Sequence, residues 1–121
     1  MRRWLPIFAL LVACGGERSV HIAVTTSIEP SIRVGSERIE IPAGLAVGVR
    51  AQAVEDEIIQ SELDVDLVAV NAGFVGIEPA LEHNEWVIYG VSAGRTDVEL
   101  FVEGDLVGDI PAIVVESHPT D

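Results

Sequence analysis

The sequence predicts an all-β fold, an antiparallel sandwich of about seven or eight short strands, and three observations support this prediction. From residue 14 onward the chain contains 17 valines and 11 isoleucines but six leucines, a composition that favours pleated strands over helices. Several short segments alternate apolar with polar residues, and turn residues separate them at short intervals. A parallel α/β sheet would need a long helix after nearly every strand, and no such helix is predicted.

The predicted elements follow the chain in order. Strands are expected at 20–24, 38–42, 45–53, 64–71, 74–77, 85–89, 96–103 and 110–116, each a run of β-branched or alternating residues bounded by turn signals such as Ala43-Gly44 and Gly108-Asp109. The clearest is 96–103, where alternation predicts that Val98, Leu100 and Val102 are buried while Glu99 and Glu103 face solvent. Single helical turns are predicted at 55–63 and 78–83, as connections between strands.

The N-terminus has the order of a secretory signal: a basic pair, an apolar stretch at 4–13, and small residues around a cysteine. Ten residues rise only about 15 Å as a helix, about half the hydrocarbon thickness, so the stretch is too short for a permanent transmembrane anchor. We therefore expect a signal peptide at 1–13, a tether at 14–19, one domain at 20–117 and a disordered tail at 118–121. Removal of the signal leaves 108 residues, which is enough for one core.

The residues Leu11, Val12, Ala13, Cys14 and Gly15 resemble the lipobox of bacterial lipoproteins. The resemblance implies cleavage after Ala13, a diacylglycerol on the thiol of Cys14, and an acylated amine at the new N-terminus. It also implies that the lipid bilayer is a partner and, because Gly15 is not an aspartate, that the outer membrane is the favoured location. The alternative is that Cys14 is a small buried hydrophobic residue, as free cysteines often are.

The segments 39–53, 87–100 and 113–115 are similar to the bacterial immunoglobulin-like domains known as Big or BIG2. The run from Ile88 to Val102 corresponds to the family pattern V-x-G-V-x-A-G-x-A-x-I-x-V, and the similarity covers about 34–116. It implies an immunoglobulin-like sandwich in which Gly90 and Gly94 supply turn conformations. The tryptophan-bearing middle strand of the family is replaced here by residues 65–71, which contain no tryptophan.

The charge of the chain excludes several classes of partner. Its formal net charge is −13 with seven basic residues, all of them arginine, and loss of Arg2 and Arg3 with the signal would lower it to −15. Such a chain repels nucleic acids and anionic membrane surfaces. The single cysteine excludes an intrachain disulfide, a cysteine-ligated zinc site and a CxxC redox pair.

No catalytic residue, cofactor site or metal site is predicted, so we expect the protein not to be an enzyme. The histidines His21, His83 and His118 have no G-x-S-x-G serine near them. The acidic clusters at 55–57 and at Asp64 and Asp66 offer too few oxygens for calcium. A hydrolase that depends on His83 is kept as a third hypothesis.

The leading functional hypothesis is a lipid-anchored, non-enzymatic module of the cell envelope that contacts protein or polysaccharide. Phe101 is the predicted exposed contact, because it interrupts the polar side of its strand. Trp86 is expected in the core rather than as a sugar-binding platform. The alternative hypothesis is an inhibitor or accessory subunit of an envelope enzyme or assembly complex, steered to a basic partner by the acidic charge.

Overall fold

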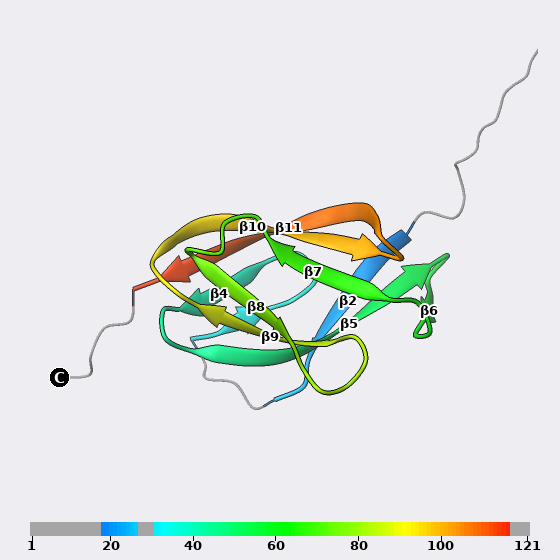
Figure 1. Ribbon diagram of the computed structural model, residues 1–121, viewed down its shortest axis with the longest axis horizontal. Helices are drawn as coiled ribbons and strands as arrows, with labels where there is room; N and C mark the ends of the chain where they lie inside the picture. Colours follow the sequence, from blue (N-terminus) through cyan, green and yellow to red (C-terminus); the bar gives the residue numbers. More distant parts are fainter. Residues whose placement is uncertain (1–17, 27–30, 117–121) are drawn as a thin grey trace, which may run out of the picture.

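The computed structural model describes residues 18–26 and 31–116 as two packed β-sheets (Figure 1). One sheet has the strand order β3-β4-β11-β10-β7, and the other has the order β2-β5-β9-β8 with β6 paired to β5. The strands are β2 (Arg18–Val24), β3 (Arg33–Val34), β4 (Ile39–Pro42), β5 (Ala46–Glu55), β6 (Ile58–Gln60), β7 (Val65–Ala69), β8 (Val75–Pro79), β9 (Glu85–Gly90), β10 (Gly94–Val102) and β11 (Asp105–Val115). The predicted all-β sandwich is confirmed.

The core lies between the sheets and consists almost entirely of β-branched residues and alanine. Val98 and Val102 are fully buried and Leu100 is nearly so, while Glu99 is half-buried and Glu103 is exposed. The predicted register of β10 is therefore confirmed. The alternation predicted for 45–53 also holds, because Val47, Val49, Ala51 and Ala53 are all buried.

The antiparallel prediction needs one correction, because β4 and β11 pair in parallel, with Ile39 opposite Ala112. The chain leaves the first sheet directly after this pair and joins the second. The amide of Ala43 donates to the carbonyl of Val115 in the first sheet, and the amide of Gly44 donates to the carbonyl of Gly90 in the second. Because the chain passes to the second sheet after Pro42, β4 and the last strand, β11, can lie side by side and run in the same direction.

The predicted role of Gly90 in a turn is wrong. Gly90 ends β9 and does not have a positive φ. A Cβ there would lie 2.6 Å from the carbonyl oxygen of Pro42, so the residue is small because β4 passes close to it. Gly94 begins β10 directly after the bend at 92–93, and its φ of 159° is one that residues with a side chain rarely adopt, as the resemblance implied. A Cβ there would also lie 2.4 Å from the ring of Phe74. Both glycines permit close packing.

The two predicted helical turns are also wrong. Residues 55–63 form the end of β5, a two-residue turn and strand β6, and residues 78–83 include the last two residues of β8. The β-branched pair Ile58 and Ile59 favours a strand, and Asp56 and Glu57 adopt the positive φ angles of 52° and 66° that a tight hairpin turn requires. No helix occurs in the residues that the structure describes.

The described chain begins and ends at opposite ends of the sandwich (Figure 1). Strand β2 begins at Arg18, opposite the last residue of β5, two positions before the predicted domain boundary. Strand β11 ends at Val115 beside Pro42. Cys14, the cleavage position after Ala13, and His118 lie outside the described residues.

Candidate functional site

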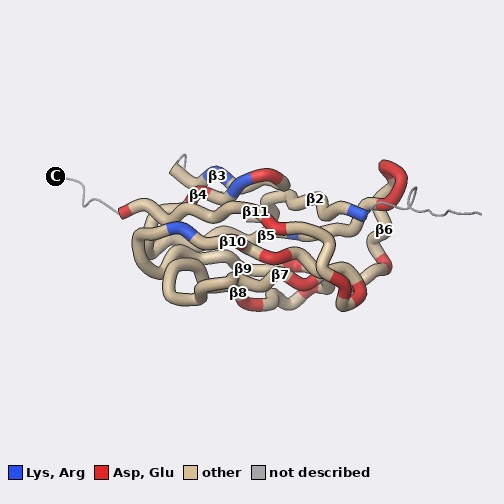
Figure 2. The backbone as a smooth tube through the Cα atoms, turned by 90° about the horizontal axis from the view of Figure 1, so that it is seen from above, with Lys and Arg blue, Asp and Glu red and all other residues tan. Residues whose placement is uncertain are grey.

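The two ends of the sandwich differ in charge, and both are built from connections between strands. We call the first the acidic end: it comprises connections 56–57, 61–64, 80–84 and 103–104, and β2 begins there. We call the second the neutral end: it comprises connections 43–45, 70–74 and 91–93. Figure 2 shows acidic residues gathered near β6 and few charges at the opposite end.

The connections of the acidic end carry six carboxylates and no arginine. The carboxylates are Asp56, Glu57, Glu62, Asp64, Glu82 and Glu103. Alternation along single strands could not predict this gathering, because the six residues belong to four separate connections. The topology brings them to one end.

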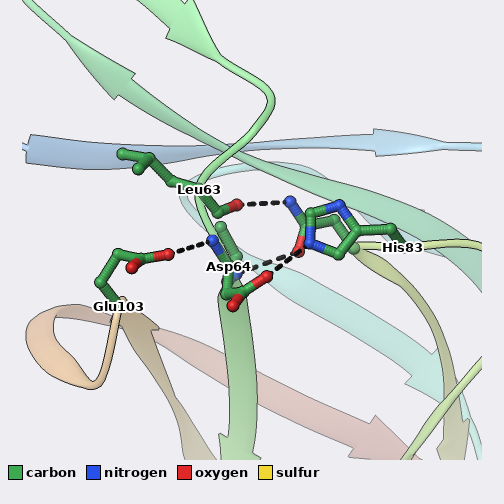
Figure 3. A network of polar contacts seen from close by, with 6 residues as sticks. Leu63, Asp64, His83 and Glu103 are labelled. Carbon is green, nitrogen blue, oxygen red and sulfur yellow. Dashed lines mark hydrogen bonds and ion pairs between the residues drawn. The ribbon is translucent and has the colours of Figure 1, made fainter.

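A network of polar contacts centred on Asp64 joins three of these connections (Figure 3). The side chain of Asp64 lies 2.6 Å from Nε2 of His83, and the backbone amide of Asp64 donates to a carboxylate oxygen of Glu103 at 2.6 Å. The amide of Glu103 donates in return to the carbonyl of Asp64. Asp64 thus connects the start of β7 to the 80–84 loop and to the β10–β11 hairpin.

Asn84 completes this network from the half-buried side of the loop. Its side-chain oxygen accepts from the amide of Val65 at 3.0 Å, and its side-chain amide donates to the carbonyl of Leu63 at 2.8 Å. Its φ of 64° lies in the left-handed region, which asparagine tolerates better than most residues. Asn84 therefore fixes the 80–84 loop against the start of β7. Sequence analysis missed this residue, because its partners lie about twenty positions away.

Arg18 brings the first described strand into the acidic end through an ion pair with Glu55. The pKa of the Arg18 guanidinium is raised, first by its hydrogen bond to Glu55 and further by the charges of Glu55, Asp105 and Glu103, while desolvation acts in the opposite direction. The β10–β11 hairpin thus lies near enough to β2 for its carboxylates to act on Arg18. Arg18 offsets part of the acidic charge at this end.

A shallow depression of about 360 Å³ opens beside this network. It is bordered by the start of β7 and by residues 79–86, and Trp86 and His83 both line it. Trp86 is half-buried and packs against the core, and its indole Nε1 is buried with no hydrogen-bond partner among the described atoms. Trp86 thus contributes to the core at this end of the sandwich and also borders the depression.

The large apolar side chains that are exposed at the acidic end are aliphatic, whereas the contact predicted from the sequence was the aromatic Phe101. Phe101 is half-buried, and its partner across the hairpin, Leu106, is 57% exposed. Ile58 and Ile59 are 62% and 51% exposed, and Leu81 is fully exposed. Successive strand residues point to opposite faces, so the exposure of both isoleucines shows that β6 projects beyond the sandwich.

The neutral end is formed by small and apolar residues. Val70 and Val91 are exposed there, as are Ala72 and Ala93. Its connections are held mainly by backbone hydrogen bonds, such as the one from the amide of Val91 to the carbonyl of Phe74. The connections of this end therefore offer apolar side chains and carry no charged residue.

A tyrosine on the outer face of the second sheet lies close to the neutral end. The ring of Tyr89 lies over Gly76, where an added Cβ would lie 2.1 Å from the ring. The hydroxyl of Tyr89 donates to Glu78 at 3.1 Å. This hydrogen bond, together with the carboxylate charge and slight desolvation, raises the pKa of Tyr89.

Of the three histidines considered in the sequence, His21 and His83 lie in the part of the chain that the structure describes. His21 is exposed on β2, and the hydrogen-bonded partner of His83 is a carboxylate. Within 18–26 and 31–116, no group of three or more histidine, cysteine, aspartate or glutamate side chains is arranged to hold a metal ion. The same residues contain no helix long and apolar enough to cross a membrane.

Comparisons with known proteins give a fold but no family. No family model matches the chain, and no curated protein matches it. The structure is similar to S-layer protein SbsC domains 4 and 5, with a TM-score of 0.54 and 14% identity over 78% of this chain and 53% of that chain. It is also similar to SbsC domains 5–6, with a TM-score of 0.56 and 14% identity over 83% of this chain and 48% of that one.

A longer structure of the same S-layer protein, rSbsC(31-844), matches with a TM-score of 0.57 and 14% identity over 83% of this chain and 14% of that chain. The chain thus spans about half the length of the two-domain structures and a small part of the longer one. At this identity the likeness concerns the fold alone. The described residues form a β-sandwich similar to part of a multidomain surface-layer protein.

Proposed function

We propose that the chain is a lipid-anchored, non-catalytic module of the cell envelope that presents its neutral end to a protein or polysaccharide. The position of Arg18 carries the proposal. Strand β2 begins at this residue, only four positions after Cys14, and four residues span at most about 14 Å. Acyl chains on Cys14 would therefore hold the acidic end close to the bilayer and direct the neutral end away from it.

Two further features support this function. The sandwich resembles domains of a surface-layer (S-layer) protein. The described chain also begins and ends at opposite ends of the fold, which is the geometry that an extended structural module needs. Function does not follow from fold, so the anchor requires a direct test.

The test is metabolic labelling with a radioactive fatty acid in cells that express the full chain. The expected result is label in the native protein and none in Cys14→Ser. A matched control, Cys14→Ser with Ser19→Cys, keeps one thiol nearby but moves it out of the lipobox-like segment, and it should also remain unlabelled. Equal label in the native protein and Cys14→Ser would refute the anchor.

A second candidate function, an accessory subunit that binds a basic partner, is favoured by the six carboxylates of the acidic end. Close opposite charges raise association rates and fix register. Replacing Glu57, Glu62 and Glu82 with glutamine should reduce capture of such a partner after crosslinking in membranes. The control replaces exposed acids away from this end, Glu37→Gln, Asp97→Asn and Asp109→Asn, with the same change in charge. Equal capture by both triple variants would contradict this function.

A further inference from the structure

The projecting β5–β6 hairpin lies beside the point where the chain enters the fold. Glu55 pairs with Arg18 on one edge of β5 and with Ile58 on the other. These three residues form one row across three strands, and neighbouring strands are about 4.8 Å apart. The Cα atoms of Arg18 and Ile58 are therefore about 10 Å apart, less than the reach of the chain back to Cys14.

The hairpin offers apolar side chains that the fold does not cover. Ile58 and Ile59 are 62% and 51% exposed, although they are adjacent residues that point to opposite faces of β6. Leu106, the second residue of β11 beside the turn of the β10–β11 hairpin, is also exposed. The adjacent isoleucines Ile58 and Ile59 are therefore the apolar surface of this hairpin, and exposed apolar surface marks contacts with a partner or a membrane.

From this arrangement we propose that Ile58 and Ile59 contact the headgroup region of the bilayer beside the anchor. The inference rests on the proposed lipidation of Cys14, which would hold the hairpin near the membrane. Apolar side chains add to the hold of an acyl chain in proportion to the apolar area that they bury. The hairpin therefore acts as a second, protein-borne contact that fixes the orientation of the sandwich.

The carboxylates of the acidic end determine which lipid headgroups the hairpin can contact. Asp56 and Glu57 form the turn before Ile58, and Glu103 and Asp105 lie in the hairpin beside Arg18. Because these carboxylates would approach the surface with the isoleucines, anionic lipids should oppose the contact, and zwitterionic lipids should permit it. The occupant that we assign is accordingly a zwitterionic bilayer surface.

The test uses the full lipidated protein, purified in detergent and reconstituted into phosphatidylcholine vesicles that contain a lipid-borne quencher. A fluorescent dye is attached to Ile58→Cys, to Ile59→Cys and, as a matched control at the neutral end, to Val91→Cys, which replaces another exposed aliphatic residue. Acylation would block the native thiol of Cys14. We expect quenching at positions 58 and 59 to exceed that at 91 by about threefold or more, as for side chains held at the interface.

Addition of anionic phosphatidylglycerol should reduce quenching at position 58, and added salt should restore it. Equal quenching at 58 and 91, or stronger quenching in anionic vesicles, would overturn the inference. Failure of the anchor itself looks different: the protein would not float with the vesicles, and the dye would also label Cys14. Flotation without quenching at 58 and 59 would refute the hairpin contact and leave the anchor standing.

Discussion

The acidic end and the neutral end are closed in different physical ways. At the acidic end, side chains of Asp64, Asn84 and Glu103 hydrogen-bond to backbone atoms or to side chains of other connections. At the neutral end the chain passes between sheets, and backbone atoms of Gly90 and Pro42 approach so closely that no side chain fits between them. The acidic end therefore depends more on side-chain contacts between its connections. The neutral end also has side-chain hydrogen bonds, from Asn71 and Ser92, but it contains the closest backbone packing.

This difference explains why substitutions should act unequally at the two ends. Buried backbone cannot move without disturbing both sheets, whereas exposed polar contacts exchange with water and contribute modestly. The following variants test this contrast.

The largest effect is expected at the neutral end, from Gly90→Ala. The new Cβ would lie 2.6 Å from the carbonyl oxygen of Pro42, and overpacking of this kind costs about 2–3 kcal/mol of the free energy of unfolding. Urea denaturation measures the loss. The control, Gly108→Ala, places a Cβ where nothing lies within 4 Å, and it should leave stability unchanged or raise it by at most about 1 kcal/mol. Equal effects would contradict close packing at Gly90.

A smaller loss is expected at the acidic end, from Asn84→Ala. The variant loses two hydrogen bonds and places alanine at a φ of 64°, which together cost about 2 kcal/mol. Asn84→Gly keeps the backbone conformation and should lose less.

The matched variant at the neutral end is Asn71→Ala, which removes one exposed hydrogen bond to the amide of Gly73. It should cost about 0.5–1 kcal/mol in the same denaturation experiment. If Asn71→Ala lowers the free energy of unfolding more than Asn84→Ala does, side-chain hydrogen bonds matter more at the neutral end, which contradicts the comparison.

Glu57→Gly should stabilise the protein. Glu57 has a φ of 66° in the β5–β6 turn, a conformation that glycine adopts freely and other L-residues adopt at a cost of about 1 kcal/mol. Thermal unfolding should show a higher Tm. Glu62→Gly, which removes the same charge where no positive φ is found, should not raise it. If both variants raise the Tm equally, relief of charge repulsion rather than of backbone strain is responsible.

The smallest effect concerns an isolated charged contact close to the neutral end. Glu78→Gln should lower the pKa of Tyr89 toward its ordinary value of about 10, because the hydrogen bond and charge that raise it are weakened. Tyr89 is the sole tyrosine of the chain, so ultraviolet absorbance titration of its phenolate reads this pKa directly.

The sign of the linked stability follows from the raised pKa. The folded state holds the phenolic proton more tightly than the unfolded state, so the contribution is fully present below about pH 10. It disappears as the pH rises through the raised pKa of the folded protein. Glu99→Gln, on the outer face of the other sheet, should leave the titration unchanged, and a shift there would mean that general charge rather than the Glu78 contact governs Tyr89.

Periodicity predicted the strands well, since each of the eight expected segments overlaps a strand of the sandwich. Period-two alternation in β10 reflects burial of one face, which local sequence records directly. Strands β3 and β6 were not predicted. Strand β3 has only two residues, too few for an alternation to be visible. Strand β6 follows the acidic residues 55–57, and its two isoleucines are exposed on its two faces, so no alternation marks it. The parallel pairing of β4 with β11 is also a long-range property.

The candidate site was predictable only in part. The acidic clusters at 55–57 and at Asp64 and Asp66 were visible in the sequence. The contact between Asp64 and Glu103, however, depends on the pairing of β7 with β10. Asn84 carried no local signal of its role. Phe101 was selected as an exposed contact because it interrupts a polar face, yet the hairpin geometry exposes its neighbour Leu106 more fully.

The central claim, that lipid on Cys14 holds the acidic end against a bilayer, is tested most directly by the intact mass of the protein purified from membranes. The account predicts a chain that begins at Cys14, bears the mass of attached acyl groups, and partitions into the detergent phase. A chain that retains residues 1–13 without added mass and remains in the aqueous phase would contradict it.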